Sequence, residues 1–311
     1  MDFSLFQQQL KDALLNNNAK KLILKLIDAP YRYESLLNPF DFKTKLYQSF
    51  LRTQENKYYK FITNTSMALF ASYNYEFIDK DKLIYSTSRT ENDETIIDSK
   101  RANFSFAFKN EDTKKIYAVL TKKRDVYSAN DTIQIFDKVK ESSMVLANIF
   151  RDYKIETFLW FIEDTIRKNE EYYHANTTIV DTDKYELRVK YGAELFDHFN
   201  HIDDWKQVER ELETFKNSNF KEFLVMPDLD TDEEALESLV ELSESAWEKL
   251  NSVEPKYMKI RANVFNQSNP NSNLFKALKQ REIIQISRDE DELKNNILEN
   301  KYAEQNNSSS E

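Results

Sequence analysis

At 311 residues the chain is long enough for one large domain or for a core domain with an appendage, and its 40% hydrophobic content supports a buried core. It contains no cysteine, which excludes a disulfide framework and a thiolate zinc site. The formal net charge of −10 argues against a protein that coats nucleic acid with its whole surface.

The acidity of the chain is regional. Residues 1–150 hold 23 Lys and Arg against 19 Asp and Glu, whereas residues 201–250 hold 5 against 15. A basic cleft in the first half is therefore compatible with the acidic total, and the acidic stretch is typical of a solvated helical face. The start lacks the basic region of a signal peptide, and no run approaches the ~20 apolar residues of a membrane span, so we expect a cytoplasmic protein without a membrane partner.

In the first half of the chain the spacing of apolar residues changes from that of helices to that of strands. Apolar residues at helical spacing predict helices over 3–27 and 41–71. The period then becomes two, which predicts strands and polar connections between them. The predicted strands are 73–78, 82–86, 103–108 and 115–121, with a polar loop over 87–97 and a hairpin turn after residue 108.

A helix over 133–150 and a buried strand over 156–164 follow, which gives the order strand, strand, helix, strand. Beyond Tyr191 we expect helices over 203–217 and 232–251, with short strands at 223–226 and 281–287. This order predicts a mixed α/β (α+β) fold. Its central mixed sheet contains an antiparallel hairpin and is flanked by the helices at 41–71 and 133–150, with Phe104, Phe106 and Phe108 in the core.

The same pattern predicts three regions along the chain. Residues 1–200 would form the α/β core, and residues 201–290 an acidic, mostly helical region packed on it. The polar residues 291–311 end in NNSSSE and are expected to be disordered.

Residues 98–134 carry most of the chemical information. An acidic residue precedes a hairpin, lysines end its second strand, and a turn rich in Ser and Asn leads into a helix. This layout resembles the PD-(D/E)xK nucleases, and in particular type II restriction endonucleases. The segments FLWFIED (158–164) and KYGAELFDHF (190–199) resemble stretches that follow the catalytic core of such enzymes. The resemblance covers roughly residues 30–200.

The resemblance implies a site in which carboxylates hold Mg²⁺ beside the scissile phosphate of double-stranded DNA and a lysine helps to activate water. The first carboxylate falls on Asp98 or on the position of Asn103, and the lysine on Lys122 or Lys123. The second acidic position falls on Leu120 or Thr121, and neither residue is a carboxylate.

Two sources could supply the missing carboxylate. In some relatives it comes from the helix after the hairpin, which here carries Asp137 and Glu141 on the side opposite its apolar stripe. In others a glutamate from an early helix contributes, which would be Glu55. An ordinary solvated charge is the alternative for each of the three.

Cations and polar side chains after the hairpin could contact DNA phosphates. The cluster Lys122, Lys123 and Arg124 could also simply end a strand in solvent. The candidate DNA-contacting residues are Arg124, Tyr127, Ser128, Asn130 and Gln134.

Gly192 is the only glycine, so the glycine-rich motifs of P-loop ATPases, Rossmann dehydrogenases and α/β-hydrolases cannot exist and no nucleotide cofactor is expected. Gly192 itself should serve a backbone geometry or close contact that a side chain would prevent, or a plain turn into a helix. His198 and His201 lack a third ligand at a familiar spacing and are expected to be two exposed residues at a helix end.

Three functions remain open from the sequence. The first is a Mg²⁺-dependent type II restriction endonuclease that cuts double-stranded DNA at a short specific site, which the resemblance implies would act as a homodimer. The second is a catalytically inactive relative that binds DNA or assists assembly in a restriction or defence system, which Leu120 and Thr121 favour. The third is an acidic protein-interaction module.

Overall fold

The computed structural model describes residues 3–73, 75–91, 94–180, 184–218 and 221–289, and its contacts divide the chain into two compact units. The α/β unit comprises Met1–Gln9 and Tyr59–Phe220, and the helical unit comprises Leu10–Tyr58 and Lys221–Glu311. Helix α4 (Phe42–Ser72) carries the chain from one unit into the other. This division differs from the expected boundary near residue 200, because residues 10–58 group with the C-terminal helices.

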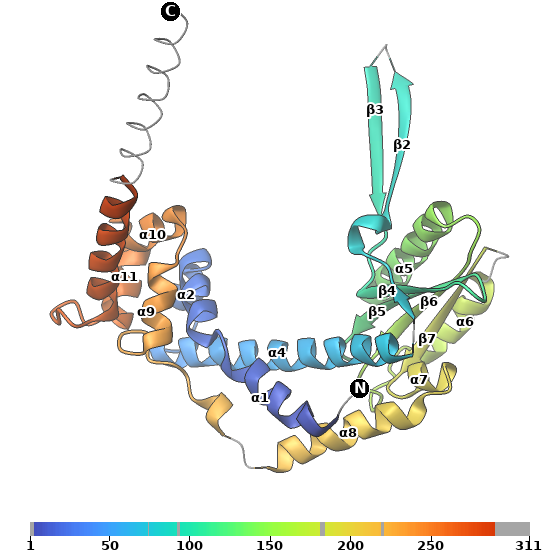
Figure 1. Ribbon diagram of the computed structural model, residues 1–311, viewed down its shortest axis with the longest axis horizontal. Coiled ribbons are helices and arrows are strands. Elements are labelled where there is room, and N and C mark those ends of the chain that lie inside the picture. Colours follow the sequence, from blue (N-terminus) through green and yellow to red (C-terminus); the bar gives the residue numbers. More distant parts are fainter. Residues whose placement is uncertain (1–2, 74, 92–93, 181–183, 219–220, 290–311) are drawn as a thin grey trace, which may run out of the picture. The chain divides into compact units, whose positions relative to one another are not determined.

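A five-stranded mixed sheet forms the centre of the α/β unit, which confirms the predicted fold class (Figure 1). Its strands, in spatial order, are β1 (Glu76–Phe77), β4 (Phe106–Asn110), β5 (Lys115–Lys122), β6 (Lys154–Phe161) and β7 (Tyr185–Tyr191). Strands β1, β4 and β5 are antiparallel neighbours, whereas β5, β6 and β7 are parallel. The predicted pairing of the two hairpin strands is confirmed, with Phe106 opposite Val119.

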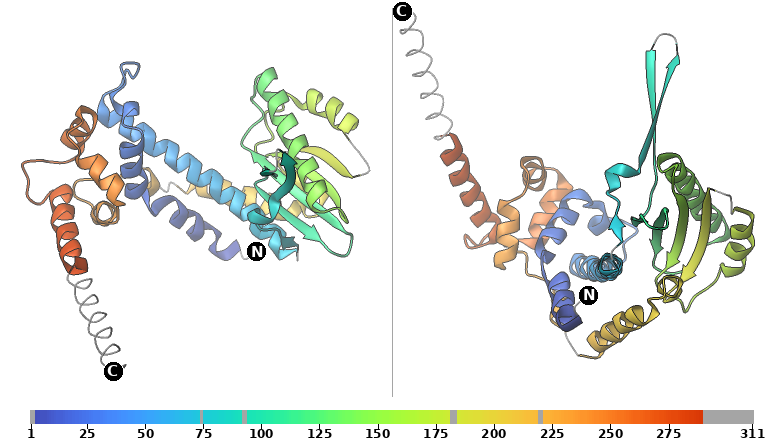
Figure 2. Two further views of the ribbon diagram at one scale, coloured as in Figure 1. Left: turned by 90° about the horizontal axis from the view of Figure 1, so that it is seen from above. Right: turned by 45° about the vertical axis from the view of Figure 1, so that its right-hand side comes forward.

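A separate two-stranded sheet lies before β4 in the chain. A short 3₁₀ helix, η2 (Lys80–Leu83), leads into β2 (Ile84–Glu91), which pairs antiparallel with β3 (Glu94–Arg101). This hairpin projects from the five-stranded sheet (Figures 1 and 2). The prediction of a polar loop over 87–97 was wrong, because the segment is rich in the β-branched residues Thr and Ile, which favour extended backbone even when their neighbours are polar.

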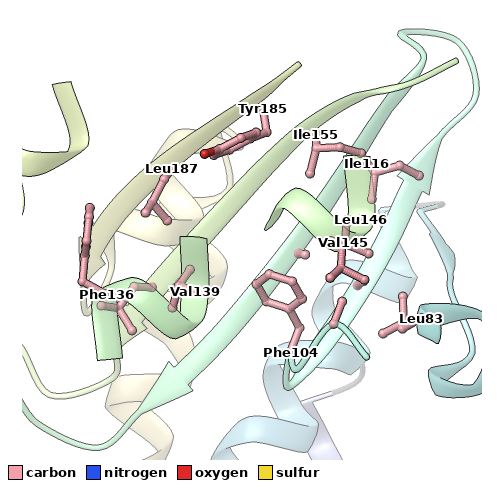
Figure 3. Packing of buried hydrophobic residues seen from close by; sticks show 14 of the residues in the cluster. Leu83, Phe104, Ile116, Phe136, Val139, Val145, Leu146, Ile155, Tyr185 and Leu187 are labelled. Atoms are coloured by element: carbon pink, nitrogen blue, oxygen red, sulfur yellow. The ribbon is translucent and has the colours of Figure 1, made fainter. Parts of the chain in front are cut away.

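One face of the five-stranded sheet is covered by α5 (Ala129–Ile149), with α6 (Glu170–Val180) beside it. Helix α5 presents Phe136, Val139 and Leu146 at helical spacing to apolar side chains from alternate positions of the strands, such as Ile155 and Leu187 (Figure 3). Figure 3 also shows Phe104 in this cluster.

The other face of the sheet is lined by aromatic rings. Trp160 of β6 packs against Phe196 of α7 (Glu194–His198) and Trp205 of α8 (Ile202–Asn217). Phe70 near the end of α4 stacks on Phe108, at 4.8 Å between ring centroids. Burial on both faces explains why β6 is an unbroken apolar run after Glu156 and Thr157. All three predicted core residues, Phe104, Phe106 and Phe108, are buried.

The helical unit has its own core, in which Leu22 and Leu26 pack with Leu239 and Ile260. The 3₁₀ helix η1 (Phe3–Leu5) and the start of α1 (Phe6–Leu15) belong to the α/β unit, and α1 continues into the helical unit. The helical unit also contains α2 (Asn18–Asp28), α3 (Tyr31–Glu34), the first part of α4, η3 (Glu222–Leu224), α9 (Glu233–Val240), α10 (Glu244–Asn251), α11 (Pro255–Val264) and a helix over residues 273–289.

The predictions of two strands in what is now the helical unit were wrong. Residues 223–226 contain the end of a 3₁₀ turn, and residues 281–287 are helical. Short apolar runs cannot be assigned by periodicity alone, because buried strands and helix faces give the same letters over four to seven residues. The tail expected over 291–311 lies outside the described residues. Of the helices described, none is long and apolar enough to cross a membrane.

Candidate functional site

The end of β5 places Thr121 on the face of the sheet away from α5. Strand residues alternate between faces, so Ile116 and Ala118 join the cluster under α5, and Leu120 packs against it. Tyr117 and Thr121 face the opposite way, where Tyr117 packs on Phe199. Of the two positions at which the resemblance requires an acid, Thr121 is therefore the one that faces α4.

Three hydroxyl groups meet at this position, and we call Tyr59, Ser105 and Thr121 the hydroxyl cluster. Thr121 Oγ1 lies 2.8 Å from Ser105 Oγ and 3.0 Å from the hydroxyl of Tyr59 on α4. Ser105 Oγ also accepts a hydrogen bond of 2.9 Å from the backbone N–H of Thr121. Thr121 is only 8% exposed, so these contacts hold the cluster in one arrangement.

The hydroxyl cluster does not fit a magnesium site. Mg²⁺ is held in proteins by carboxylates and water, because anionic oxygens offset the cost of removing part of its hydration shell. The three side chains here are neutral and already bonded to one another. Within the described part of the chain, no group of three or more His, Asp or Glu side chains could hold a metal ion.

Three cations surround the end of β5. The Nζ atom of Lys123 lies 5.1 Å from the centre of the Tyr59 ring, which places this lysine beside the hydroxyl cluster. Lys122 is half-buried, and its pKa is lowered by burial and then by the charge of Lys138 on α5. Arg124 is exposed. Thus Lys123 is the lysine that shares a face with Thr121, two residues after it.

Three of the four candidate carboxylates lie on elements away from the hydroxyl cluster, whereas Glu55 precedes Tyr59 on α4 by one helical turn. Asp98 is exposed on β3, opposite Thr87 in the two-stranded sheet. Asp137 and Glu141 are exposed on α5, which covers the face opposite the hydroxyl cluster. Glu55 is exposed on the part of α4 that belongs to the helical unit. The alternative first position, Asn103, is exposed, and its backbone N–H donates to Ser142 Oγ at 3.1 Å.

The candidate DNA-contacting residues differ in how far their side chains are free to bind. Asn130 and Gln134 are exposed in the first two turns of α5. Ser128 is the N-cap of α5, with its hydroxyl accepting from the N–H of Asp131 at 3.3 Å and donating to the Asp131 carboxylate at 2.6 Å. Tyr127 is half-buried against the α5 cluster, and its carbonyl accepts from Lys168.

A buried carboxylate that the sequence did not reveal follows the cations directly. Asp125 is fully buried, and it accepts hydrogen bonds from the N–H of Asn169 at 2.7 Å, from the Asn169 side chain at 2.6 Å and from the hydroxyl of Tyr191 at 3.0 Å. These donors use both carboxylate oxygens. Asp125 therefore joins the ends of β5 and β7 to the start of α6 and acts as a structural residue.

Gly192 meets the expectation of a special backbone geometry. Its φ of +46° lies in the left-handed region, and a Cβ atom there would lie 3.0 Å from the Cβ and Oδ2 atoms of Asp164. The N–H of Gly192 donates to Phe161, and its carbonyl accepts from Trp160 Nε1. The same residue also precedes helix α7, so it is a helix-entry turn as well.

The two histidines have separate protein partners. His198 Nε2 lies 3.0 Å from the buried carboxylate of Glu156, whereas the His201 ring stacks on Tyr73 with 3.5 Å between centroids. Neither ring is fully exposed.

Two members of the hydroxyl cluster, Tyr59 and Ser105, were not predicted from the sequence. The sequence pattern could have singled out Ser105, since it is the one polar residue within the aromatic alternation FSFAF. Tyr59 had a weaker signal, one helical turn after Glu55. Comparisons of this chain with models of protein families, with curated proteins and with solved structures returned no match.

Proposed function

We propose that this chain is a nuclease-like protein that binds double-stranded DNA without cutting it, as a non-catalytic component of a restriction or defence system. The observation that carries the proposal is the hydroxyl cluster, which lies on the same face as Lys123 where the resemblance calls for carboxylates. Neutral hydroxyls cannot offset the charge of a divalent ion, whereas the lysine remains able to contact phosphate.

The exposed cations support the binding half of the proposal. Lys123 and Arg124 are both exposed and lie next to each other after β5. Phosphate contacts by such residues release counterions from DNA, so affinity should fall as salt rises whether or not cleavage follows. Asn130 and Gln134, exposed on the first turns of α5, follow these cations in the chain and add neutral hydrogen-bonding groups. A homodimer on a duplex site belongs to the same proposal.

The test compares binding and cleavage on the same preparations. Binding is measured by fluorescence anisotropy of labelled duplex DNA as NaCl rises from about 50 to about 200 mM. The double variant Lys123→Ala/Arg124→Ala should lower the DNA affinity at the lower salt concentration by about tenfold or more. It should also reduce the slope of log affinity against log salt concentration by about 2. Lys206→Ala, an exposed lysine on α8 of the same unit, is the matched control and should leave affinity nearly unchanged.

Cleavage is assayed with plasmid DNA and Mg²⁺. We expect intact DNA with both the wild-type protein and the variants. Discrete fragments that disappear in Lys123→Ala would instead support the Mg²⁺-dependent restriction endonuclease and contradict the proposal. The absence of both DNA binding and DNA cleavage, across several sequences at low salt, would also contradict the proposal. That result would favour an acidic protein-interaction module.

A further inference from the structure

A cavity of about 570 Å³ lies within the helical unit, between α2, α3 and the first part of α4. Four cationic side chains line it: Lys25 from α2, Arg32 from α3, and Lys45 and Arg52 from α4. No acidic side chain is among its lining residues. We call it the basic cavity.

Three of the four cations have neutral partners. Lys25 Nζ donates to the carbonyl of Ser49 and to the hydroxyl of Thr53, and Lys45 Nζ donates to Gln48 Oε1 at 2.8 Å. The Arg32 guanidinium lies 5.9 Å from the centre of the Tyr31 ring. Among the described residues, no carboxylate lies within ion-pair distance of any of these four cations.

Elsewhere in the helical unit, cationic side chains form ion pairs with carboxylates. Lys11 pairs with Glu222 at 3.0 Å, Lys20 with Glu241 at 2.9 Å and Lys259 with Glu34 at 3.0 Å. The unit is therefore not short of acidic groups. The basic cavity is a place where positive charge collects without compensation from the protein.

The surroundings of Lys25 disfavour its charged form. Burial lowers its pKa, and the charges of Arg32, Lys21 and Arg52 lower it further. Each added positive charge near a half-buried ammonium raises the free energy of its charged form. A bound anion would reverse this effect, since it would stabilise all four cations together.

We propose that the basic cavity binds a phosphate-bearing ligand of nucleotide size. Arginine side chains bind phosphate through two parallel hydrogen bonds, and Arg32 and Arg52 supply two such groups. The volume is within the range of small-molecule sites. Tyr31 lines the same cavity and is 65% exposed, which leaves its ring open to stack on a base.

The phosphate has two possible sources, a free nucleotide or the 5′-phosphorylated end of a nucleic-acid strand. Side-chain cations carry the recognition in either case, so a glycine-rich phosphate loop is not required. The site lies wholly within the helical unit, and it does not depend on DNA binding by Lys123 and Arg124 of the α/β unit.

The experiment is titration calorimetry of the full chain with four probes: pyrophosphate, ADP, a 5′-phosphorylated trinucleotide and the same trinucleotide with a 5′-hydroxyl. We expect ADP or the phosphorylated trinucleotide to bind with a Kd that Arg32→Gln/Arg52→Gln raises by about tenfold or more. Lys43→Gln is the matched control, because Lys43 is an exposed lysine on α4 outside the cavity. It should change the Kd by less than about twofold.

A second variant separates the base from the phosphate and does not rely on the arginines. Tyr31→Ala should weaken ADP binding by about fivefold or more and leave pyrophosphate binding nearly unchanged, since the aromatic ring stacks on a base and not on a phosphate. ADP binding tighter than both trinucleotides identifies a free nucleotide. A preference for the phosphorylated trinucleotide over its hydroxyl counterpart identifies a strand end, and both results support the proposal.

Two results would overturn it. The first is that none of the four probes binds the wild-type protein at millimolar concentration. The second is that Lys43→Gln weakens binding as much as Arg32→Gln/Arg52→Gln, because the anion would then respond to the general charge of the surface and not to the cavity. Melting temperatures of all variants establish that each remains folded.

Discussion

The hydroxyl of Tyr59 lies 3.0 Å from the hydroxyl of Thr121, and this contact joins α4 to the C-terminal end of β5. Tyr59 and Thr121 are 62 residues apart in the chain. The contact occupies the face on which a nuclease of the resembled class would assemble its carboxylates. Its contribution to stability can be measured separately from any contribution to binding.

Replacing Thr121 with valine tests the hydroxyl cluster. Valine has nearly the same shape, so Thr121→Val removes the hydroxyl and leaves Tyr59 and Ser105 without that partner. We expect the free energy of unfolding in urea to fall by about 1–2 kcal/mol. DNA affinity should stay unchanged, because no cation is altered.

A double-mutant cycle with Ser105→Ala provides the control. The two hydroxyls are 2.8 Å apart, so the combined variant should lose less than the sum of the single losses. Strictly additive losses would show that the two hydroxyls do not interact in solution.

Gly192→Ala tests the backbone geometry after β7. The left-handed φ costs an L-residue about 1–2 kcal/mol, and the new Cβ would meet Asp164 at 3.0 Å. Hydrogen bonds to Phe161 and Trp160 prevent the backbone from moving away. We expect the free energy of unfolding to fall by about 2 kcal/mol or more.

The companion variant Gly192→Ala/Asp164→Ala isolates the contribution of the Asp164 carboxylate. It relieves the close approach of the Oδ2 atom but keeps the Asp164 Cβ contact at 3.0 Å and the φ strain, so only part of the loss should be recovered. Full recovery would mean that the backbone conformation costs nothing.

Local patterns predicted the strands and helices that depend on strong periodicity. The alternation in 103–108 and 115–121 and the stripe of α5 each involve repeated apolar positions. The structure confirms the two strands, the helix and the burial of Phe104, Phe106 and Phe108, although β4 begins only at Phe106. Polar strands such as β2 and β3 do not give such a pattern. Their pairing depends on backbone preference and was missed.

The site was less predictable, because it depends on partners that are distant in sequence. Thr121 could be named as a departure from the acidic position, but its hydroxyl partners come from α4 and from Ser105, the residue before β4. Asp125 follows two lysines and an arginine and so resembles a solvated charge run. Its burial depends on donors 44 and 66 residues away, which no local pattern reveals.

Asp125→Asn tests that buried carboxylate. Burial and then the charge of Asp125 raise the pKa of Tyr191, so the phenol stays protonated and donates to the carboxylate. Three hydrogen-bond donors converge on the Asp125 carboxylate. An amide would present its NH₂ group to at least one of them, and that donor would lose its acceptor. We expect the free energy of unfolding to fall by about 2–3 kcal/mol.

Asp137→Asn is the matched control for this substitution. Asp137 is exposed on α5, and the same chemical change there should alter stability by less than about 0.5 kcal/mol. Equal effects at the two positions would contradict the structural role of Asp125.

Glu156 gives the chain a predictable response to acid. Its side chain is 3% exposed on β6, with Arg188 Nε at 2.6 Å, His198 Nε2 at 3.0 Å and Lys115 Nζ at 3.6 Å. Burial alone would raise its pKa, but the hydrogen bonds and charges of His198 and Arg188 outweigh burial and lower it from 4.5 to about 2. The folded protein therefore binds this proton more weakly than the unfolded chain does.

The sign of the pH dependence follows from that difference. The stabilisation due to ionised Glu156 is fully present above the unfolded value of 4.5 and is lost as the pH falls through about 2. Its size is at most about 3 kcal/mol, since one pKa unit corresponds to about 1.4 kcal/mol. Urea unfolding of wild type and Glu156→Gln at a series of pH values should give curves that converge between pH 4.5 and pH 2. Exposed Glu141→Gln should run parallel to wild type throughout, and a Glu156→Gln curve that did the same would show that Glu156 has no special stabilisation in the folded state.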